Sequence, residues 1–305
     1  MIKGVTDTIL MIRPKNFGSN PETLSDNHFQ AEITSNEQNK VKDQAISEFD
    51  SMVSKLRDHD IEIIVIEDTD DIVRPDAIFP NNWFSTHTNG VVITYPMRSE
   101  NRRIERREDI IDELKEQYNL SKRYGFEYLE DQEQYLEGTG SMVLDRVNKI
   151  VYAGLSHRTD IRVLEKFCVL LGYNKVIFHP FDDQGKSIYH TNVMMTMGDK
   201  YVILCTESIT NDEERTELLA QLKSDNKDII DISYEQMNAF AGNMLQLRTK
   251  LGEVVLVMSN SAYNSLTAEQ IDRISAFNKI IQIPIPTIEK YGGGSVRCMI
   301  AEIFR

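Results

Sequence analysis

Five polar residues recur along this chain at an almost constant spacing. They are Asn82, Glu137, His190, Asn243 and Cys298, separated by 55, 53, 53 and 55 residues. Among them are a thiol, an imidazole and a carboxylate, which can supply a nucleophile, a general base and a group that orients the base. If each residue comes from one of several structural units around an axis, the five side chains converge on one cleft. The spacing therefore predicts a site for covalent cysteine–histidine chemistry.

Cys298 follows a glycine triplet, Gly292–Gly294, near the C-terminus. Glycine lacks a Cβ, so we expect the triplet to form part of a mobile loop over the cleft and the run after it to be a strand carrying Cys298. Arg297 favours the thiolate if its side chain turns toward the sulfur, although neighbours on a strand usually point to opposite faces. The alternative is that Cys298 is a buried structural cysteine, Glu137 a solvated turn residue and His190 a core histidine.

The elements that would position these residues repeat in the order strand, strand, helix, strand. Four complete rounds are expected over residues 76–129, 138–178, 187–232 and 243–283. Their helices are expected over residues 101–118, 160–172, 212–223 and 267–278, and the first round closes with a strand over 126–129. A helix over 39–60 and a strand over 61–66 come before these rounds. The strand with Cys298 would pair with residues 8–12 and complete a fifth unit. Such self-similarity is typical of repeats wrapped about an axis, the alternative being two α/β domains.

The composition argues against several classes of function. The formal net charge of -14 disfavours nucleic acid and anionic membrane as partners. The first seven residues lack the apolar region of a signal peptide, and no apolar run is long enough to span a bilayer. Cys168, Cys205 and Cys298 are widely spaced, and the six histidines form no HxH or HExxH motif. We therefore expect reduced thiols in a cytoplasmic protein, without a disulfide framework or a metal.

Several segments resemble the guanidino-group-modifying enzymes of the pentein superfamily, over nearly the whole chain. The motifs are Glu137-Gly138-Thr139-Gly140, His190-Thr191-Asn192 and the glycine-rich loop before Cys298. Residues 13–17, 27–30, 79–84 and 189–192 look most like the amidinotransferase-like or citrulline-utilisation hydrolase branch, which is related to arginine deiminase, arginine dihydrolase and dimethylarginine dimethylaminohydrolase. The resemblance implies one domain over residues 1–305 with the pentein fold. This fold is a five-bladed α/β-propeller whose pseudo-five-fold repeats surround a central active-site cleft.

By that resemblance Cys298 is the nucleophile that attacks the central carbon of a guanidino or ureido group. His190 protonates the leaving nitrogen and then deprotonates the hydrolytic water, for which a pKa near neutrality is expected. Glu137 is ionised and hydrogen-bonds the imidazole, the substrate, or both. The expected substrate-binding residues are Asn82, Asn192, Asn243 and Asn27. The partner is a small-molecule amino acid, no cofactor is implied, and a homo-oligomer remains open.

The sequence departs from the arginine-deiminase pattern at two positions, because deiminases carry Asp where Asn82 and Asn192 stand. Two carboxylates suit a guanidinium, which is cationic and only donates hydrogen bonds. An asparagine suits a neutral ureido group, against which a buried carboxylate would lack a partner. The two asparagines therefore favour citrulline, or a dihydrolase that takes arginine through citrulline to ornithine. The alternative is that one of them is a turn residue and that Asn81 faces the site.

Other functions stay open at this point. In an amidinotransferase an amine, and not water, resolves the adduct, and the sequence does not separate the two reactions. An arginine deiminase or a dimethylarginine dimethylaminohydrolase would use the same nucleophile. A non-catalytic binding module of the same fold would be expected to lack the cysteine, the histidine or the glutamate, and all three are present.

Overall fold

The computed structural model describes residues 4–24 and 27–304, and the predicted repeat is present there as five three-stranded sheets. In each sheet the central strand pairs antiparallel with one neighbour and parallel with the other. This pairing is the expected order of strand, strand, helix, strand, since a helix connects the two parallel strands. Residues 1–3, 25–26 and 305, which the expected domain over 1–305 includes, lie outside the described residues.

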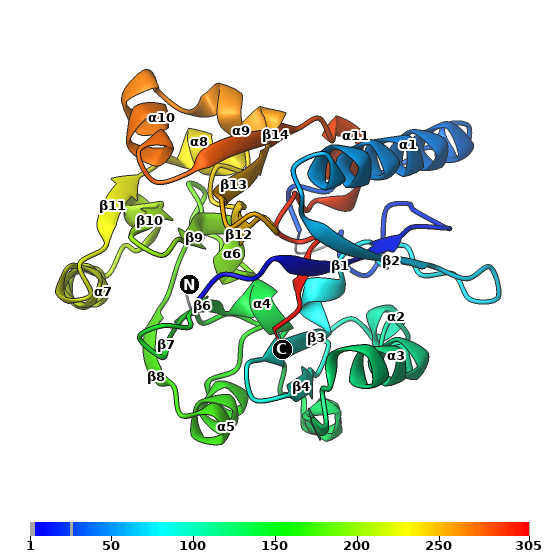
Figure 1. The fold of residues 1–305 in the computed structure, drawn as a ribbon, viewed down its shortest axis with the longest axis horizontal. Coiled ribbons are helices and arrows are strands. Elements are labelled where there is room, and N and C mark those ends of the chain that lie inside the picture. The colour runs from blue at the N-terminus through cyan, green and yellow to red at the C-terminus, as the bar shows by residue number, and fades with distance from the viewer. Residues whose placement is uncertain (1–3, 25–26, 305) are drawn as a thin grey trace.

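The five sheets are arranged as blades around a central axis, and the outer helices lie at the rim (Figure 1). The strands, given sheet by sheet, are β15 (Ala301–Glu302), β1 (Thr8–Arg13) and β2 (Glu62–Glu67); β3 (Phe84–His87), β4 (Val91–Thr94) and β5 (Lys122–Gly125); β6 (Val143–Asp145), β7 (Ile150–Gly154) and β8 (Asn174–Phe178); β9 (Met195–Met197), β10 (Tyr201–Leu204) and β11 (Asp228–Asp231); β12 (Leu245–Arg248), β13 (Val254–Ser259) and β14 (Lys279–Ile283).

The two ends of the chain close the ring, as the sequence predicted. β15 pairs antiparallel with β1, with Ile9 opposite Glu302 and Leu10 opposite Ala301. β1 in turn pairs parallel with β2, which follows the first long helix. The fifth unit is therefore built from both ends of the chain, and the architecture is a pentein-like propeller of α/β blades.

Each parallel strand pair is bridged by an outer helix whose apolar residues face the sheet. In α1 (Gln38–Arg57) the buried positions include Val41, Ala45, Phe49 and Met52, which recur on one helical face. The other helices are α2 (Glu100–Arg103), α3 (Glu108–Tyr118), α4 (Gly138–Ser141), α5 (Ile161–Leu171), α6 (Thr191–Met194), α7 (Asp212–Ser224), α8 (Tyr234–Asn238), α9 (Asn260–Ser265), α10 (Ala268–Ser275) and α11 (Pro286–Gly292), with the 3-10 helices η1 (Pro80–Asn82), η2 (Glu127–Gln132) and η3 (Thr206–Ser208). None of the helices within residues 4–24 and 27–304 is long and apolar enough to cross a membrane.

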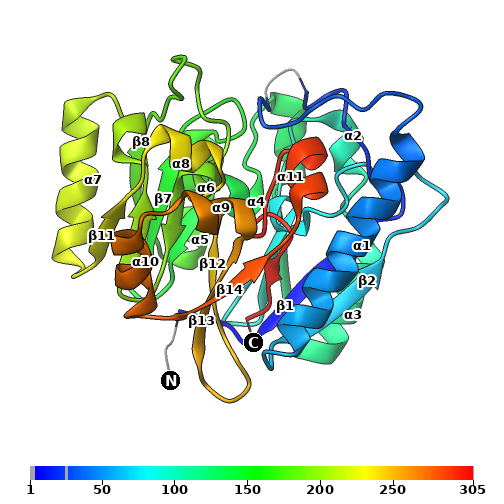
Figure 2. The same cartoon turned by 90° about the horizontal axis from the view of Figure 1, so that it is seen from above.

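The apolar core runs from blade to blade, because the sheets bury both faces. In β1, Ile9 packs into a cluster shared with β12 and β13, whereas Leu10 packs into one shared with β4 and Trp83. Successive residues of a strand point to opposite faces, so one strand contributes to two clusters. Figure 2 shows the blades side by side with their helices outward. This packing leaves the strand ends at the axis free to carry polar side chains.

We expected the recurring polar residues at the start of the first strand of each unit, but the structure places Asn82, Glu137 and His190 in or directly before short helical turns. Asn82 ends η1, Glu137 directly precedes α4, and His190 directly precedes α6. The predicted strand through Cys298 is wrong, since residues 296–299 form a turn and β15 starts only at Ala301. A single helical turn at the same place in successive blades directs these side chains toward the axis. The predicted convergence of the recurring residues is therefore present although the local structure differs.

Two other predictions need correction in the first complete unit. The strand expected over 126–129 is wrong, because β5 lies at Lys122–Gly125 and residues 127–132 form η2. The helix expected over 101–118 is divided into α2 and α3. The short helix α2 matters for the site, since its residue Arg102 lines the cavity described below.

Candidate active site

Cys298 and His190 line one cavity, which we call the front cavity. Asn27 and Asn82 also line this cavity, and Glu137 lies behind His190. The structure therefore brings together the thiol, the imidazole and the carboxylate that the sequence singled out, from three different blades. Asn192 and Asn243 contact the sulfur of Cys298 and are not among the described residues of this cavity's wall.

Glu137 fixes the orientation of His190. Its Oε2 accepts a hydrogen bond from Nε2 of His190 at 2.8 Å, and its Oε1 accepts one from the backbone N–H of Arg98 at 3.0 Å. Arg158 lies 3.4 Å from the same carboxylate, which is fully buried. An ionised carboxylate only accepts, so Nε2 carries the proton and Nδ1 keeps a lone pair for the reaction.

Burial lowers the pKa of His190 to about 4, with the positive charges of Arg158 and Arg102 adding to the effect and Glu137 opposing it. This value lies below the near-neutral pKa expected from the sequence, because the imidazole is enclosed beside two guanidinium groups. Burial alone would raise the pKa of Glu137, but Arg158, His190 and Arg102 together hold it well below its usual range. At neutral pH the pair is therefore a carboxylate and a neutral imidazole.

Two amide side chains hold the sulfur of Cys298. Nδ2 of Asn243 lies 3.3 Å from Sγ, and Nδ2 of Asn192 lies 3.6 Å from it. The amide of Asn243 has a fixed direction, since its Oδ1 accepts a hydrogen bond from the N–H of Arg297 at 3.1 Å. Burial raises the pKa of the Cys298 thiol, and the hydrogen bond from Asn243 partly offsets this rise.

The side chain of Arg297 turns away from Cys298. Its Nη2 donates to the carboxylate of Glu302 at 2.7 Å, and its Nη1 donates to the carbonyl of Ile300 at 2.9 Å. Direct pairing of Arg297 with the thiolate is therefore not part of this site.

Asn82, and not its neighbour Asn81, faces the front cavity. Oδ1 of Asn82 accepts a hydrogen bond from Nη1 of Arg102 at 3.1 Å, whereas Nδ2 is buried and has no partner among the described residues. A guanidinium only donates, so this contact fixes the amide with its N–H groups toward the cavity. The side chain of Asn81 is absent from the described wall. This resolves the alternative left open by the sequence.

Gly140 lets the backbone approach this part of the site. A Cβ added there would lie 2.4 Å from Nδ2 of Asn82 and 2.9 Å from Nδ1 of His190. Both distances are too short for a real contact, so the position requires glycine. The Glu137-Gly138-Thr139-Gly140 motif thus combines the carboxylate with the glycine that makes room for the two side chains.

Three charged residues of the cavity wall were missed by the sequence analysis: Asp76, Arg102 and Arg158. Arg102 forms two hydrogen bonds with the Glu105 carboxylate, at 2.8 and 2.9 Å. Oδ2 of Asp76 accepts from Asn20 at 2.6 Å, while its buried Oδ1 has no hydrogen-bond partner among the described residues. Burial raises the pKa of Asp76.

A sequence signal for the two arginines exists. Arg102 lies 20 residues after Asn82, and Arg158 lies 21 residues after Glu137. The two arginines therefore recur at nearly the same spacing as the five polar residues. Applying that spacing to the charged residues elsewhere in each unit would have placed both arginines near the axis.

Two loops cover the front cavity together. The carbonyl of Gly293 accepts hydrogen bonds from Nδ2 of Asn27 at 3.2 Å and from the Tyr189 hydroxyl at 3.1 Å. The N–H of Ala31 donates to the carbonyl of Lys290 at 2.7 Å. Gly293 has a φ of +63°, and a Cβ there would lie 2.4 Å from Nδ2 of Asn27. The amide of Asn27 therefore ties the N-terminal segment to the glycine loop.

Within the described residues, no group of three or more His, Cys, Asp or Glu side chains is arranged to hold a metal ion. The chemistry that this site can perform with its own groups is attack by a thiol on a planar carbon, with a neutral imidazole to transfer protons.

Comparison with known proteins gives a family. The family model described as N,N dimethylarginine dimethylhydrolase, eukaryotic, matches residues 13–305. No curated protein matches the chain.

Solved structures share the fold. The N-terminal domain of ArgZ bound to substrate, an arginine dihydrolase from the ornithine–ammonia cycle in cyanobacteria, has a TM-score of 0.71 at 15% identity, and the alignment covers 98% of both chains. A binary complex of an AgrE variant with L-arginine has a TM-score of 0.72 at 15% identity and covers 97% of this chain. A dimethylarginine dimethylaminohydrolase variant carrying an adduct with S-methyl-L-thiocitrulline has a TM-score of 0.67 at 16% identity, covering 98% of this chain and all of that one. This chain spans only 40% of the full-length ArgZ and of that AgrE chain.

Proposed function

This chain belongs to the family of eukaryotic N,N-dimethylarginine dimethylhydrolases, within the pentein guanidino-modifying enzymes, and from that membership we propose that it hydrolyses carbon–nitrogen bonds of arginine or citrulline through an adduct on Cys298. The observation that carries this proposal is the shared cavity of Cys298 and His190, with Glu137 bonded to the imidazole at 2.8 Å. These are the nucleophile, the proton carrier and the orienting group that such hydrolysis needs.

In the proposed reaction the sulfur of Cys298 bonds to the guanidino carbon and one carbon–nitrogen bond breaks. The thiol proton passes through His190 to the leaving nitrogen, which departs as ammonia. Water then adds to the same carbon, the carbon–sulfur bond breaks, and the thiol is restored. The product of this first round is citrulline. A second round on its ureido group releases a second ammonia and leaves the carbamate of ornithine, whose remaining carbon–nitrogen bond breaks to give carbon dioxide and ornithine.

One group in the wall suits the other end of an amino acid. The unpartnered Oδ1 of Asp76 is an acceptor for an α-ammonium group. Arg102 and Arg158 lie nearer the reacting end, since Arg102 contacts Asn82 at 3.1 Å and Arg158 contacts Glu137 at 3.4 Å. We place the ureido or guanidino end between Asn82 and Cys298.

The buried charges favour arginine as the entering substrate. Three carboxylates, Asp76, Glu105 and Glu137, face two guanidinium groups, Arg102 and Arg158. With neutral His190 this leaves one negative charge, which arginine balances and citrulline does not. Burial raises the pKa of Glu105 to about 7 and also raises that of Asp76, so this excess is only part of a charge at neutral pH. The N–H groups that Asn82 presents suit the carbonyl oxygen of citrulline. A site that attracts the cation and then binds the neutral intermediate fits an arginine dihydrolase.

The test is incubation of the protein with arginine, citrulline, agmatine and dimethylarginine, followed by measurement of ammonia, citrulline, ornithine and dimethylamine. Ornithine and about two equivalents of ammonia per arginine would support the dihydrolase. Citrulline as the end product would instead indicate a deiminase, and release of dimethylamine a dimethylarginine dimethylaminohydrolase. Turnover only when an amine acceptor is added would indicate an amidinotransferase and contradict the proposed hydrolysis.

We also propose that residues 1–305 fold as one pentein domain and act in the cytoplasm. The first part predicts one cooperative unfolding transition of the whole chain, observed alike by circular dichroism and by fluorescence of Trp83. Two separate transitions would contradict it.

Fractionation of the native cells, with immunodetection of the chain, would test the proposed cytoplasmic location.

A further inference from the structure

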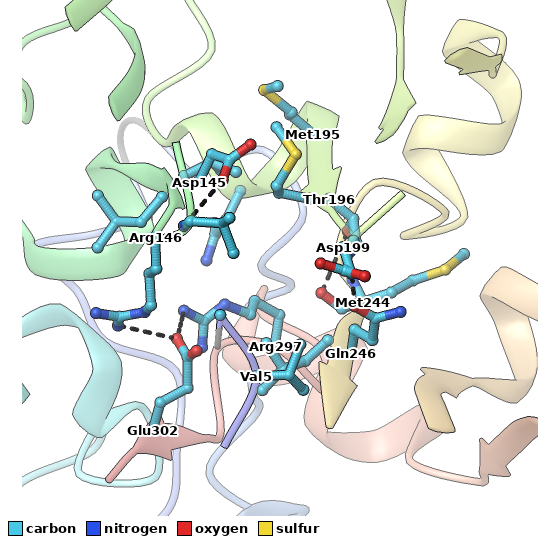
Figure 3. Close-up of a pocket in the computed structure, with 18 of the residues that line it drawn as sticks. Val5, Asp145, Arg146, Met195, Thr196, Asp199, Met244, Gln246, Arg297 and Glu302 are labelled. Carbon is cyan, nitrogen blue, oxygen red and sulfur yellow. Dashed lines mark hydrogen bonds and ion pairs between the residues drawn. The ribbon is translucent and has the colours of Figure 1, made fainter. Parts of the chain in front are cut away.

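A second cavity lies behind the nucleophile. We call it the rear cavity. Arg297, Glu302 and Met244 are among the residues that line it (Figure 3), and Asn192 lines it as well. The inner strands β6, β9 and β12 begin next to the turns that carry the site residues and run away from them, and later residues of each strand line this cavity. The rear cavity therefore lies at the other end of the axis from the glycine loop.

The side chain of Asn192 lies between the rear cavity and the sulfur of Cys298. Its Nδ2 lies 3.6 Å from Sγ of Cys298, and the residue also lines the rear cavity. Its Oδ1 is buried and has no hydrogen-bond partner among the described residues, in a side chain only 1% exposed. Buried polar atoms are nearly always bonded, to ordered water where no protein group is available. An unsatisfied amide at the end of a cavity therefore points to a small hydrogen-bonding molecule.

The proposed reaction needs such a molecule on this side. Each round consumes one water and frees one ammonia, while the amino-acid part of the adduct stays in a front cavity covered by two loops. A route past the bound amino acid would require those loops to open between the two half-reactions. Opening would expose the adduct to bulk solvent and release citrulline early.

We propose that the rear cavity is a passage for water and ammonia, with Asn192 as its inner gate. This inference rests on the proposed function. Water enters from the rear, its oxygen bonds to the adduct carbon as the carbon–sulfur bond breaks, and its protons pass to His190 and to the sulfur. In the preceding half-reaction, uncharged ammonia leaves through the same cavity.

The charges of the rear cavity suit neutral molecules. Glu302 is shared by Arg297, at 2.7 Å, and by Arg146, at 3.6 Å, and Figure 3 shows both guanidinium groups directed at this one carboxylate. All three side chains are at least about nine-tenths buried. Lys227 is paired with Asp145 at 2.8 Å in the same wall. With Asp199 the described part of this wall holds three positive and three negative side chains, so it has no net charge that would attract an ion.

The experiment fills the rear cavity without touching the site. Val5 and Leu245 line the rear cavity, and both are largely buried. Val5→Trp places an indole in the cavity, and Leu245→Phe is a smaller change that serves if the first variant folds poorly. The matched control is Val169→Trp on the outer face of α5, where the side chain is 86% exposed. Folding of each variant is checked by its melting temperature.

The measurement is single turnover of arginine, acid-quenched, with the adduct on Cys298 quantified by intact-protein mass spectrometry. We expect the filled variants to hydrolyse the adduct about tenfold more slowly and to slow its formation by less, because only hydrolysis needs a molecule to enter before the carbon–sulfur bond can break. The adduct should therefore accumulate. The control should match the wild type. Damage to the packing around Cys298 would slow formation as much as hydrolysis.

Filled variants that hydrolyse the adduct at the wild-type rate, or that slow both steps equally, would overturn the passage. Absence of any turnover or adduct in the wild type, with all four candidate substrates, would instead contradict the proposed function and the passage with it. The two failures are therefore distinguishable, because the first occurs in an enzyme whose wild-type activity is measured in the same experiment.

Discussion

Arg102 donates a hydrogen bond to Oδ1 of Asn82 across 3.1 Å, and this contact decides what Asn82 offers to a ligand. Arg102 is itself held by Glu105 through two hydrogen bonds, so its position is fixed on both sides. The amide of Asn82 therefore presents N–H groups, and not its oxygen, to the front cavity. A donor at this position suits the carbonyl oxygen of a ureido group better than a guanidinium.

The first prediction follows from this orientation. In Asn82→Asp one carboxylate oxygen would keep the contact with Arg102, and the other would replace the donor with an acceptor. We expect kcat/KM for citrulline to fall relative to that for arginine by roughly a hundredfold, because citrulline loses a hydrogen-bond donor while arginine gains an acceptor. A dihydrolase should then also begin to release citrulline.

The control for added charge is Asn174→Asp, at an exposed position of β8. Adding Asn192→Asp to Asn82→Asp tests the second asparagine of the sequence argument. If the ratio of kcat/KM for citrulline to that for arginine rises, or stays at the wild-type value in both variants, the asparagines do not select the substrate by its charge.

The second prediction concerns the nucleophile. Cys298→Ser should lower kcat by at least about 10³-fold, because a serine hydroxyl is not ionised beside a neutral imidazole. Cys168→Ala and Cys205→Ala should keep wild-type kcat, since these thiols pack in the apolar clusters of other blades. Their free energy of unfolding should fall by about 1 kcal/mol, the cost of a small cavity. Substantial turnover by Cys298→Ser would refute the covalent mechanism.

The sequence predicted the ring because its signal is periodic. Each blade must bury both faces of a sheet and cover the parallel pair with a helix, so the apolar pattern recurs and the polar residues at the axis recur with it. The phase shared by Glu137, His190 and Cys298 is a consequence of this geometry. It is therefore readable without knowledge of the contacts.

The charged residues of the cavity were missed for a physical reason. Asp76, Arg102 and Glu105 look like surface residues in a chain with 27% charged residues, and they are buried only because they pair with one another across different segments. Such pairing depends on contacts between distant residues, which local patterns do not contain. The turn at Cys298 was mistaken for a strand because apolar residues surround it on both sides.

The third prediction tests the loop that covers the front cavity. Gly293→Ala should lower kcat/KM by about tenfold, because a Cβ would lie 2.4 Å from Nδ2 of Asn27 and break the contact between the two loops. Gly252→Ala is a matched control, since Gly252 also has a positive φ, of +88°, and its Cβ would meet nothing within 4 Å. Equal kinetics of the two variants would show that the contact between the two loops at Gly293 does not affect turnover.

The fourth prediction concerns stability against pH. The folded protein holds the pKa of His190 at about 4, below the ordinary value of 6.5, so between these values the unfolded chain binds a proton that the folded chain does not. Stability should therefore fall as the pH drops from 6.5 toward 4, with His190 accounting for about 2 kcal/mol between pH 7 and pH 5. Urea unfolding at both pH values measures this loss. The loss should be smaller by that amount in His190→Asn, and an equal loss in both proteins would contradict the assignment.

The last prediction concerns the amide that holds the sulfur. Asn243 donates to Sγ of Cys298 at 3.3 Å, and its direction is fixed by the N–H of Arg297. A hydrogen bond to sulfur stabilises the thiolate more than the thiol, so Asn243→Leu should raise the pKa of Cys298 further above its usual range. The measurement is the rate of alkylation of Cys298 by iodoacetamide between pH 6 and pH 11, with mass spectrometry to identify the modified residue. The inflection should move to higher pH in Asn243→Leu and stay in place in Asn82→Ser, which alters the cavity wall without touching the sulfur. An unchanged inflection in Asn243→Leu would leave the amide with a packing role only, since loss of packing alone would change the reactivity at every pH and not its midpoint.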